Sequence, residues 1–92
     1  MATFIMLGKY TNEGLKGISK ERTQGALNLI RELNGEVRSI YALLGTHDLH
    51  LTVDFPGIKE AMRASIELNK LTGITFTTSE AVTAAEFDEF MT

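Results

Sequence analysis

The fold is decided by residues 36–55, which read EVRSIYALLGTHDLHLTVDF. Residues 47–55 alternate between apolar and polar side chains, and this period of two is typical of a β-strand with one face on a core. Residues 36–44 predict a second strand, and Gly45-Thr46 predicts a tight turn between them. We therefore expect a β-hairpin in which residue 43 lies opposite 48, 41 opposite 50, 39 opposite 52 and 37 opposite 54.

This pairing divides the hairpin into an apolar face and a mixed face, because successive side chains of a strand point to opposite sides of the sheet. The apolar face, which we expect to pack against helices, consists of Ile40, Ala42, Leu44, Leu49, Leu51, Val53 and Phe55. The mixed face consists of Val37, Ser39, Tyr41, Leu43, Asp48, His50, Thr52 and Asp54. Helices that cover the first face leave the second one open.

The segment before the hairpin predicts a strand and a helix. Residues 3–9 form a short apolar run that suits a central strand buried on both faces. A helix follows from Thr11 or Asn12 to about Leu33, because a capping residue begins it and Asn34-Gly35 ends it. Its buried stripe is expected to contain Leu15, Ile18, Arg22, Ala26, Leu29 and Leu33.

The segment after the hairpin predicts a second helix and a fourth strand. Pro56-Gly57 precede a helix at about 58–71, and Thr72-Gly73 end it. Its buried stripe is expected to contain Ile58, Ala61, Met62, Ser65, Leu68 and Asn69. Residues 74–79 are rich in β-branched residues and predict a strand.

The chain ends in a short predicted helix at residues 83–91. Thr83 and Glu86 have the spacing of a capping box, and Phe87 and Phe90 lie on one face, so we expect this helix to dock on the domain. With 92 residues the chain has room for a single domain, residues 1–92.

The predicted order of elements is β-α-β-β-α-β, which is that of the ferredoxin-like α+β sandwich. Right-handed connections place both helices on one face of a four-stranded antiparallel sheet. The first strand is apolar on both sides, with Phe4 and Met6 on one face and Ile5 and Leu7 on the other. An apolar strip on an open sheet marks an interface. We therefore expect a homodimer or higher homo-oligomer in which two sheets face each other across a closed space.

Composition argues against several classes of function. Nine Lys and Arg against twelve Asp and Glu form no basic stripe, so nucleic acid is not an expected partner. The chain has no cysteine, which excludes thiolate chemistry and fits the reducing cytoplasm. No stretch has the roughly 20 apolar residues that span a bilayer, and no phosphate-loop pattern is present. We therefore expect neither a membrane partner nor a cofactor.

Three segments resemble the GYD domain family, over nearly the whole chain. They are TFIMLGKYT at residues 3–11, GTHD at 45–48 with the apolar strand, Asp54 and Pro56 after it, and the stretch from Thr75 to Phe87. The family usually has a tyrosine where His47 stands. The resemblance implies a dimeric α+β barrel. The group of proteins with this fold includes small monooxygenases, chlorite-dismutase-like proteins and muconolactone-isomerase-like proteins.

Asp48, His50 and Tyr41 are the candidate catalytic residues. Tyr41 lies opposite His50, and Asp48 is the preceding residue on the same face. A carboxylate beside an imidazole holds its tautomer and suits it to act as a general base near neutral pH, while a phenol can stabilise a developing oxyanion. The alternative interpretation, which we favour, is a polar network at a dimer interface or a set of solvent-exposed polar residues on an open sheet.

The candidate ligand-binding residues are polar groups at or near the open face, namely Arg22, Lys9, Thr52 and Asp54. Arg22 and Lys9 are candidate anchors for an anion, although each also suits an ordinary role as a snorkelling or strand-end side chain. No metal site is expected, because His47 and His50 point to opposite faces of one strand.

Three functions remain open at this point. The first is a homo-oligomer that holds a small apolar or anionic molecule between facing sheets. The second is a cofactor-independent enzyme of monooxygenase or isomerase type, in which His50 moves a proton with help from Asp48 and Tyr41. The third is a purely structural assembly module.

Overall fold

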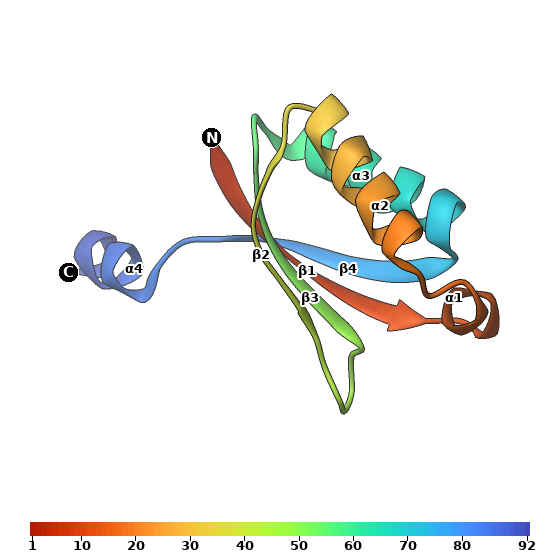
Figure 1. Ribbon diagram of the computed structural model, residues 1–92. Coiled ribbons are helices and arrows are strands. Elements are labelled where there is room, and N and C mark those ends of the chain that lie inside the picture. Colours follow the sequence, from red (N-terminus) through yellow and green to blue (C-terminus); the bar gives the residue numbers. More distant parts are fainter.

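The computed structural model describes residues 1–92 as four strands and four helices. In chain order they are β1 (Ala2–Tyr10), α1 (Asn12–Lys16), α2 (Lys20–Glu32), β2 (Glu36–Ala42), β3 (Leu49–Phe55), α3 (Ile58–Thr72), β4 (Ile74–Ala81) and α4 (Ala84–Met91). The strands form one antiparallel sheet in the order β2-β3-β1-β4. Helices α2 and α3 lie side by side on one face, and the other face is open (Figure 1). The predicted ferredoxin-like α+β fold is confirmed, with β1 in a central position.

The core lies between the sheet and the two long helices. It consists of Phe4, Met6, Ile30, Leu51, Val53, Phe55, Ala61, Ala64 and Leu68, none of which is more than 2% exposed. The rings of Phe4 and Phe55 meet edge to face with their centroids 5.9 Å apart, a favoured arrangement of aromatic pairs. The predicted helix-side face of the hairpin is thus confirmed for its second strand.

The hairpin has shorter strands and a longer connection than predicted. β2 ends at Ala42 and β3 begins at Leu49, so residues 43–48 join them. The backbone N–H of Leu43 still donates to the carbonyl of Asp48 at 2.8 Å, which confirms that predicted pair. The helices do not cover this tip, and Leu44 is therefore fully exposed instead of lying on the core face.

A β-bulge in β2 changes the predicted face of Val37. The pairing with β3 shifts just beyond Val37, so Arg38 is an extra residue in its strand. Val37 therefore pairs with Val53 and packs against the core. Glu36 lies opposite Asp54, the position that the prediction gave to Val37. The prediction assumed an uninterrupted period of two, and one extra residue reverses every side-chain direction beyond it.

The first predicted helix, residues 12–33, is two helices. Ser19 lies between them in an extended conformation, and its hydroxyl accepts a hydrogen bond from the N–H of Arg22 at 3.0 Å. A residue that caps a helix in this way is not itself helical, so α2 begins afresh after Ser19. Leu15 and Ile18, which we expected in the buried stripe, are more than half exposed as a result.

Helix α3 packs on the sheet through small side chains. Ala61 and Ala64 are fully buried, together with Leu68. Ile58 and Met62, expected in the same stripe, are more than half exposed. The alanines permit a close approach between helix and sheet, and Ile58 and Met62 lie at the border of α3 with β4 instead.

Gly73 ends α3 with a φ of 73°, and its N–H donates to the carbonyl of Asn69. We expect Gly73→Ala to lower the free energy of unfolding by about 1 kcal/mol, because a Cβ disfavours this left-handed conformation. The new Cβ would also lie 3.3 Å from the hydroxyl of Thr11. Gly25→Ala is the matched control inside α2, where the nearest neighbour is Leu71 at 3.8 Å, and we expect a gain of about 0.5–1 kcal/mol. Urea unfolding measures both changes, and effects of the same sign would contradict the prediction.

Helix α4 forms as predicted but does not dock on its own domain. The hydroxyl of Thr83 accepts a hydrogen bond from the N–H of Glu86 at 3.1 Å and caps the helix. β4 leads α4 away from the sheet, so it stands apart from the rest of the chain (Figure 1). Phe87 and Phe90 contact each other edge to face, yet they are 50% and 65% exposed. The predicted docking on this domain is wrong, and the apolar face of α4 has no partner within the chain.

Candidate functional site

The open face of the sheet brings polar and apolar side chains together in rows across the strands. The register of β1 and β3 pairs Thr3 with Asp54, Ile5 with Thr52, and Leu7 with His50. The register of β2 and β3 adds Ser39 beside Thr52 and Tyr41 beside His50. An apolar strip from β1 therefore runs beside a polar strip from β3. Ile5 and Leu7 in this strip are already half-buried, although no element of the chain covers them.

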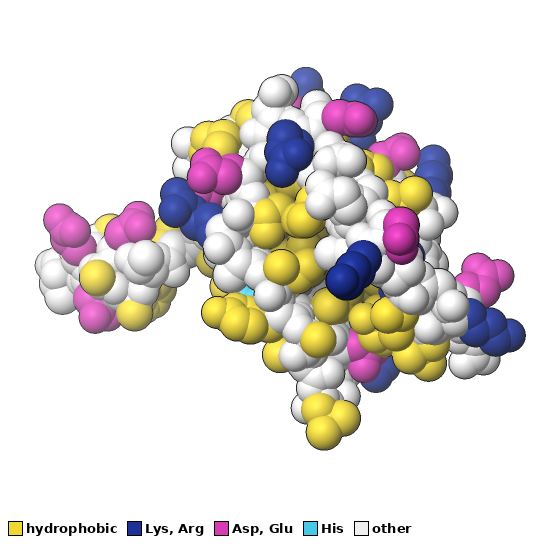
Figure 2. All heavy atoms as spheres, in the orientation of Figure 1, with side chains coloured by type: hydrophobic (Ala, Val, Ile, Leu, Met, Phe, Trp, Pro, Cys, Tyr) yellow, Lys and Arg dark blue, Asp and Glu magenta, His cyan; other side chains and the backbone are white.

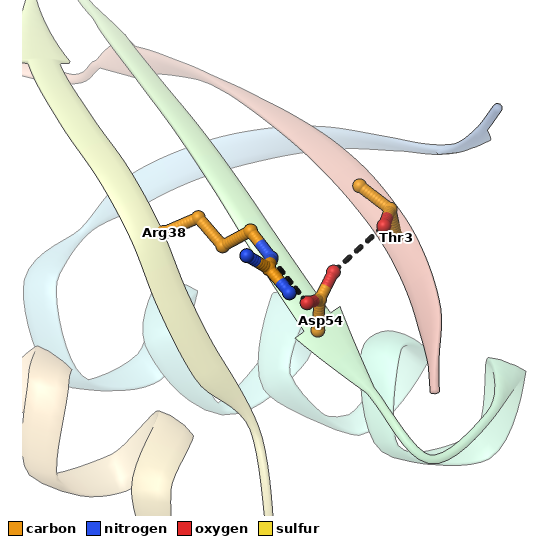
Figure 3. Close-up of polar contacts among 3 residues, drawn as sticks. All are labelled: Thr3, Arg38 and Asp54. Atoms are coloured by element: carbon orange, nitrogen blue, oxygen red, sulfur yellow. Dashed lines mark hydrogen bonds and ion pairs between the residues drawn. The ribbon is translucent and has the colours of Figure 1, made fainter. Parts of the chain in front are cut away.

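Asp54 is the most firmly held polar residue of the open face. It is only 5% exposed. The hydroxyl of Thr3 donates to one carboxylate oxygen at 2.7 Å, and Nε of Arg38 donates to the other (Figure 3). These hydrogen bonds, that from Thr3 most strongly, lower the pKa of Asp54 below its ordinary value. The carboxylate is therefore ionised at neutral pH, and it links β1, β3 and β2.

Arg38 reaches this carboxylate because of the bulge in β2. The pair with Asp54 raises the pKa of Arg38, chiefly through the hydrogen bond. Only Nε is used, the side chain is 60% exposed, and neither Nη group has a hydrogen-bond partner in the chain. Arg38 thus presents a guanidinium that is held at Nε, with free N–H groups on both Nη atoms, at the open face. The sequence did not identify Arg38 as a site residue, because no residue pattern marks the bulge that directs its side chain to the open face.

Tyr41 and His50 come together as predicted, but Asp48 is engaged elsewhere. The rings of Tyr41 and His50 are tilted, with their centroids 6.3 Å apart. Nδ1 of His50 is buried and has no hydrogen-bond partner. The carboxylate of Asp48 accepts a hydrogen bond from the backbone N–H of Tyr10 at 2.8 Å and closes the end of β1. The carboxylate–imidazole pair is therefore not formed in the chain.

Lys9 and Arg22 hold parts of the backbone together. Nζ of Lys9 donates to the carbonyl of Thr46 at 3.1 Å, which ties the end of β1 to the hairpin connection. Nη1 of Arg22 donates to the carbonyl of Gly14, and the guanidinium lies 5.9 Å from the centre of the Tyr10 ring. Arg22 belongs to α2 and so lies on the helix side of the sheet, away from the open face.

Of the remaining candidate positions, Thr52 lies in the middle of the open face, between Ile5 and Ser39. No three His, Asp or Glu side chains gather closely enough to hold a metal ion. None of the helices combines the length and apolar character needed to cross a membrane. A small hollow of about 70 Å³ lies on the helix side instead, lined mainly by apolar residues that include Ile18, Ala26 and Leu49.

Comparison with solved structures shows the same fold in another protein. The crystal structure of the leucine response regulatory protein LrpA from Mycobacterium tuberculosis is similar to this chain with a TM-score of 0.59 and 8% sequence identity. The match covers 90% of this chain and 51% of that protein, so this chain spans about half of its length. At such low identity the likeness shows the fold alone. No curated protein sequence is significantly similar to the chain.

The match to a family is more extensive. The family model of the GYD domain matches residues 4–91, which takes in every element from β1 to α4. The match covers most of the open face, including Asp54 and Arg38, and the C-terminal helix that stands apart from the sheet. The chain belongs to the GYD domain family.

Proposed function

We propose that this protein is a homodimeric binding protein that holds a small, partly apolar carboxylate between two facing sheets. The guanidinium of Arg38 binds the carboxylate, and the strip of Ile5 and Leu7 contacts the apolar part. The dimer, the ligand and a cytoplasmic location are all parts of this proposal.

Two observations support the pairing of sheets. Ile5 and Leu7 form an apolar strip on a face that no element of the chain covers, and such strips mark interfaces. A domain of 92 residues also buries a comparatively small part of its surface and is marginal alone. A second copy over the open face removes this strip from water.

The geometry of Arg38 is the observation that carries the choice of ligand. Its guanidinium is oriented by Asp54, and Asp54 is held in turn by Thr3. A guanidinium fixed in one orientation recognises the two oxygens of a carboxylate through parallel hydrogen bonds. Because the groups that orient it are already in place, little side-chain entropy is lost when an anion binds.

Binding is better supported than catalysis. A general base needs a partner that holds its tautomer, and Nδ1 of His50 has none. Asp48 makes its hydrogen bond to the backbone of Tyr10 instead. His50 and Tyr41 are better placed to line the space than to transfer a proton.

Calorimetric titration with phenylacetate and hexanoate, compared with phenylacetamide and hexanamide, tests the proposal. We expect the carboxylates to bind and the amides not to bind. Arg38→Gln should weaken carboxylate binding about tenfold or more, because a charge-assisted hydrogen bond contributes about 1.5–3 kcal/mol. Arg63→Gln is the control, since Arg63 lies on α3 beyond the helix-covered face.

The dimer is tested separately. Leu7→Asp places a charge in the apolar strip, and we expect it to yield a monomer in sedimentation equilibrium and to abolish binding. Failure of the unmodified protein to bind either carboxylate would refute the choice of ligand. So would equal affinities of Arg38→Gln and the unmodified protein.

A further inference from the structure

We infer that α4 of one copy docks in a groove between α2 and β2 of a second copy. Apolar Leu27, Val37 and Ile40 line this α2–β2 groove, together with two basic residues, Arg31 and Arg38, and one acidic residue, Glu36. The inference rests on the face-to-face pairing of the proposed function but not on its ligand.

Helix α4 has the chemistry of a docking element. With about 3.6 residues per turn, its apolar side chains share one face, which consists of Ala84, Phe87, Phe90 and Met91. Glu86 and Asp88 border that face on its two sides, and α4 has no basic residue. An exposed apolar face with acidic borders fits an apolar groove with basic borders.

The α2–β2 groove has the complementary chemistry. Figure 2 shows apolar side chains gathered in the hollow between α2 and β2, with both basic and acidic side chains around it, while acidic and apolar side chains cover α4. The only hydrogen bond of the Arg31 side chain is a long one of 3.5 Å to Asn28, so its charge remains available. The groove that lies between α3 and β4, lined by Ile58, Met62 and Ile66 among others, has no charged residue in its lining. Arg38 is paired with Asp54, so Arg31 is the basic residue that the α2–β2 groove offers to an acidic helix, with Glu36 as its one acidic neighbour in the lining.

The connection from β4 excludes the groove of the same chain. β2 and β4 are the opposite edges of one sheet, so three strand spacings, about 14 Å, separate them. Val82 and Thr83 are the only residues between β4 and α4, so three Cα–Cα steps, at most about 11 Å, join Ala81 to Ala84. The start of α4 therefore cannot reach its own α2–β2 groove.

The same connection reaches the groove of a second copy. One row across the sheet contains Glu36, Asp54, Thr3 and Ala81, from the β2 edge to the β4 edge. If a two-fold axis parallel to the strands relates two facing sheets, this row lies over its own reversed copy. Ala81, the last residue of β4, then lies opposite the partner's β2 edge. Facing sheets pack about 10 Å apart, so the three steps from Ala81 to Ala84 reach the partner's β2 edge, where the α2–β2 groove begins.

Cross-linking tests this directly, because the chain has no cysteine of its own. We mix full-length Ala84→Cys with full-length Leu27→Cys, add a short bis-maleimide and measure the covalent mass. We expect a covalent dimer. Ala85→Cys, on the opposite face of α4, is the matched control and should cross-link several-fold less.

A charge reversal tests the recognition. Arg31→Glu should lower the yield of cross-linked dimer several-fold, and adding Asp88→Lys on the α4 copy should restore it. Absence of a covalent dimer in the first mixture would overturn the inference. So would efficient linkage within one chain that carries both Ala84→Cys and Met62→Cys, since α4 would then dock on its own α3.

Sedimentation equilibrium of the unmodified protein separates the two proposals. A dimer whose α4 fails to cross-link leaves the facing sheets intact and refutes only the docking of α4. A monomer refutes both.

Discussion

Phe55→Ala is expected to lower the free energy of unfolding by about 3–5 kcal/mol. Phe55 is fully buried and meets Phe4 edge to face at the centre of the core. Its removal leaves a cavity between the sheet and the helices that the close-packed core cannot collapse to fill. Domains of this kind are stable by only about 5–15 kcal/mol, so the variant should lose a large fraction of its stability. Urea unfolding monitored by circular dichroism measures the change.

Phe76→Ala provides the graded control for this prediction. Phe76 lies in β4 and is half-buried at the border of the core. The same truncation should therefore cost less there, because part of the ring is already in contact with water. Equal losses for the two variants would mean that the core is not organised around Phe55.

The second large effect is the dependence of stability on pH at Asp54. Its pKa is lower in the folded chain than the ordinary 3.8, through the hydrogen bonds from Thr3 and Arg38. The unfolded chain therefore takes up the proton first as the pH falls. The stability that Asp54 contributes is fully present above its unfolded pKa and is lost as the pH falls through the folded one. We expect Asp54→Asn to lower the free energy of unfolding at pH 7 by about 1–3 kcal/mol.

The difference in free energy of unfolding between the unmodified protein and Asp54→Asn should then shrink below about pH 4, the ordinary range in which an aspartate titrates. Urea unfolding at a series of pH values measures this convergence. Thr3→Val, which removes the hydroxyl donor alone, should show part of the same behaviour. If the deficit of Asp54→Asn is as large at pH 3 as at pH 7, the ionised carboxylate is not what stabilises this row.

The fold could be predicted from the sequence because its signals are local and repeated. The alternation from Leu49 to Phe55 selects one face for the core, and the paired Tyr41 and His50 follow from it. The caps at the helix ends are also local, and the break before α2 could have been found from Ser19, whose hydroxyl suits a helix start. These features depend on residues close together in the chain.

The site was less predictable because it depends on contacts between distant segments. The bulge that brings Arg38 to Asp54 has no residue pattern of its own, and it moves Val37 to the other face. The carboxylate of Asp48 is close in sequence to His50, yet a backbone N–H of β1 takes it. Nearness along a strand does not determine which donor satisfies a side chain.

The bulge in β2 also affects how far copies of this chain can add to one another. β2 is an edge of the sheet, and the unpaired backbone groups of an edge are a template on which further strands assemble. The extra residue at Arg38 breaks the even spacing of those groups and adds a charge beside them. A long incoming strand therefore finds no continuous partner at this edge. Association through open faces can close on itself, whereas growth from edge to edge into fibres uses both edges of the sheet and is interrupted at β2.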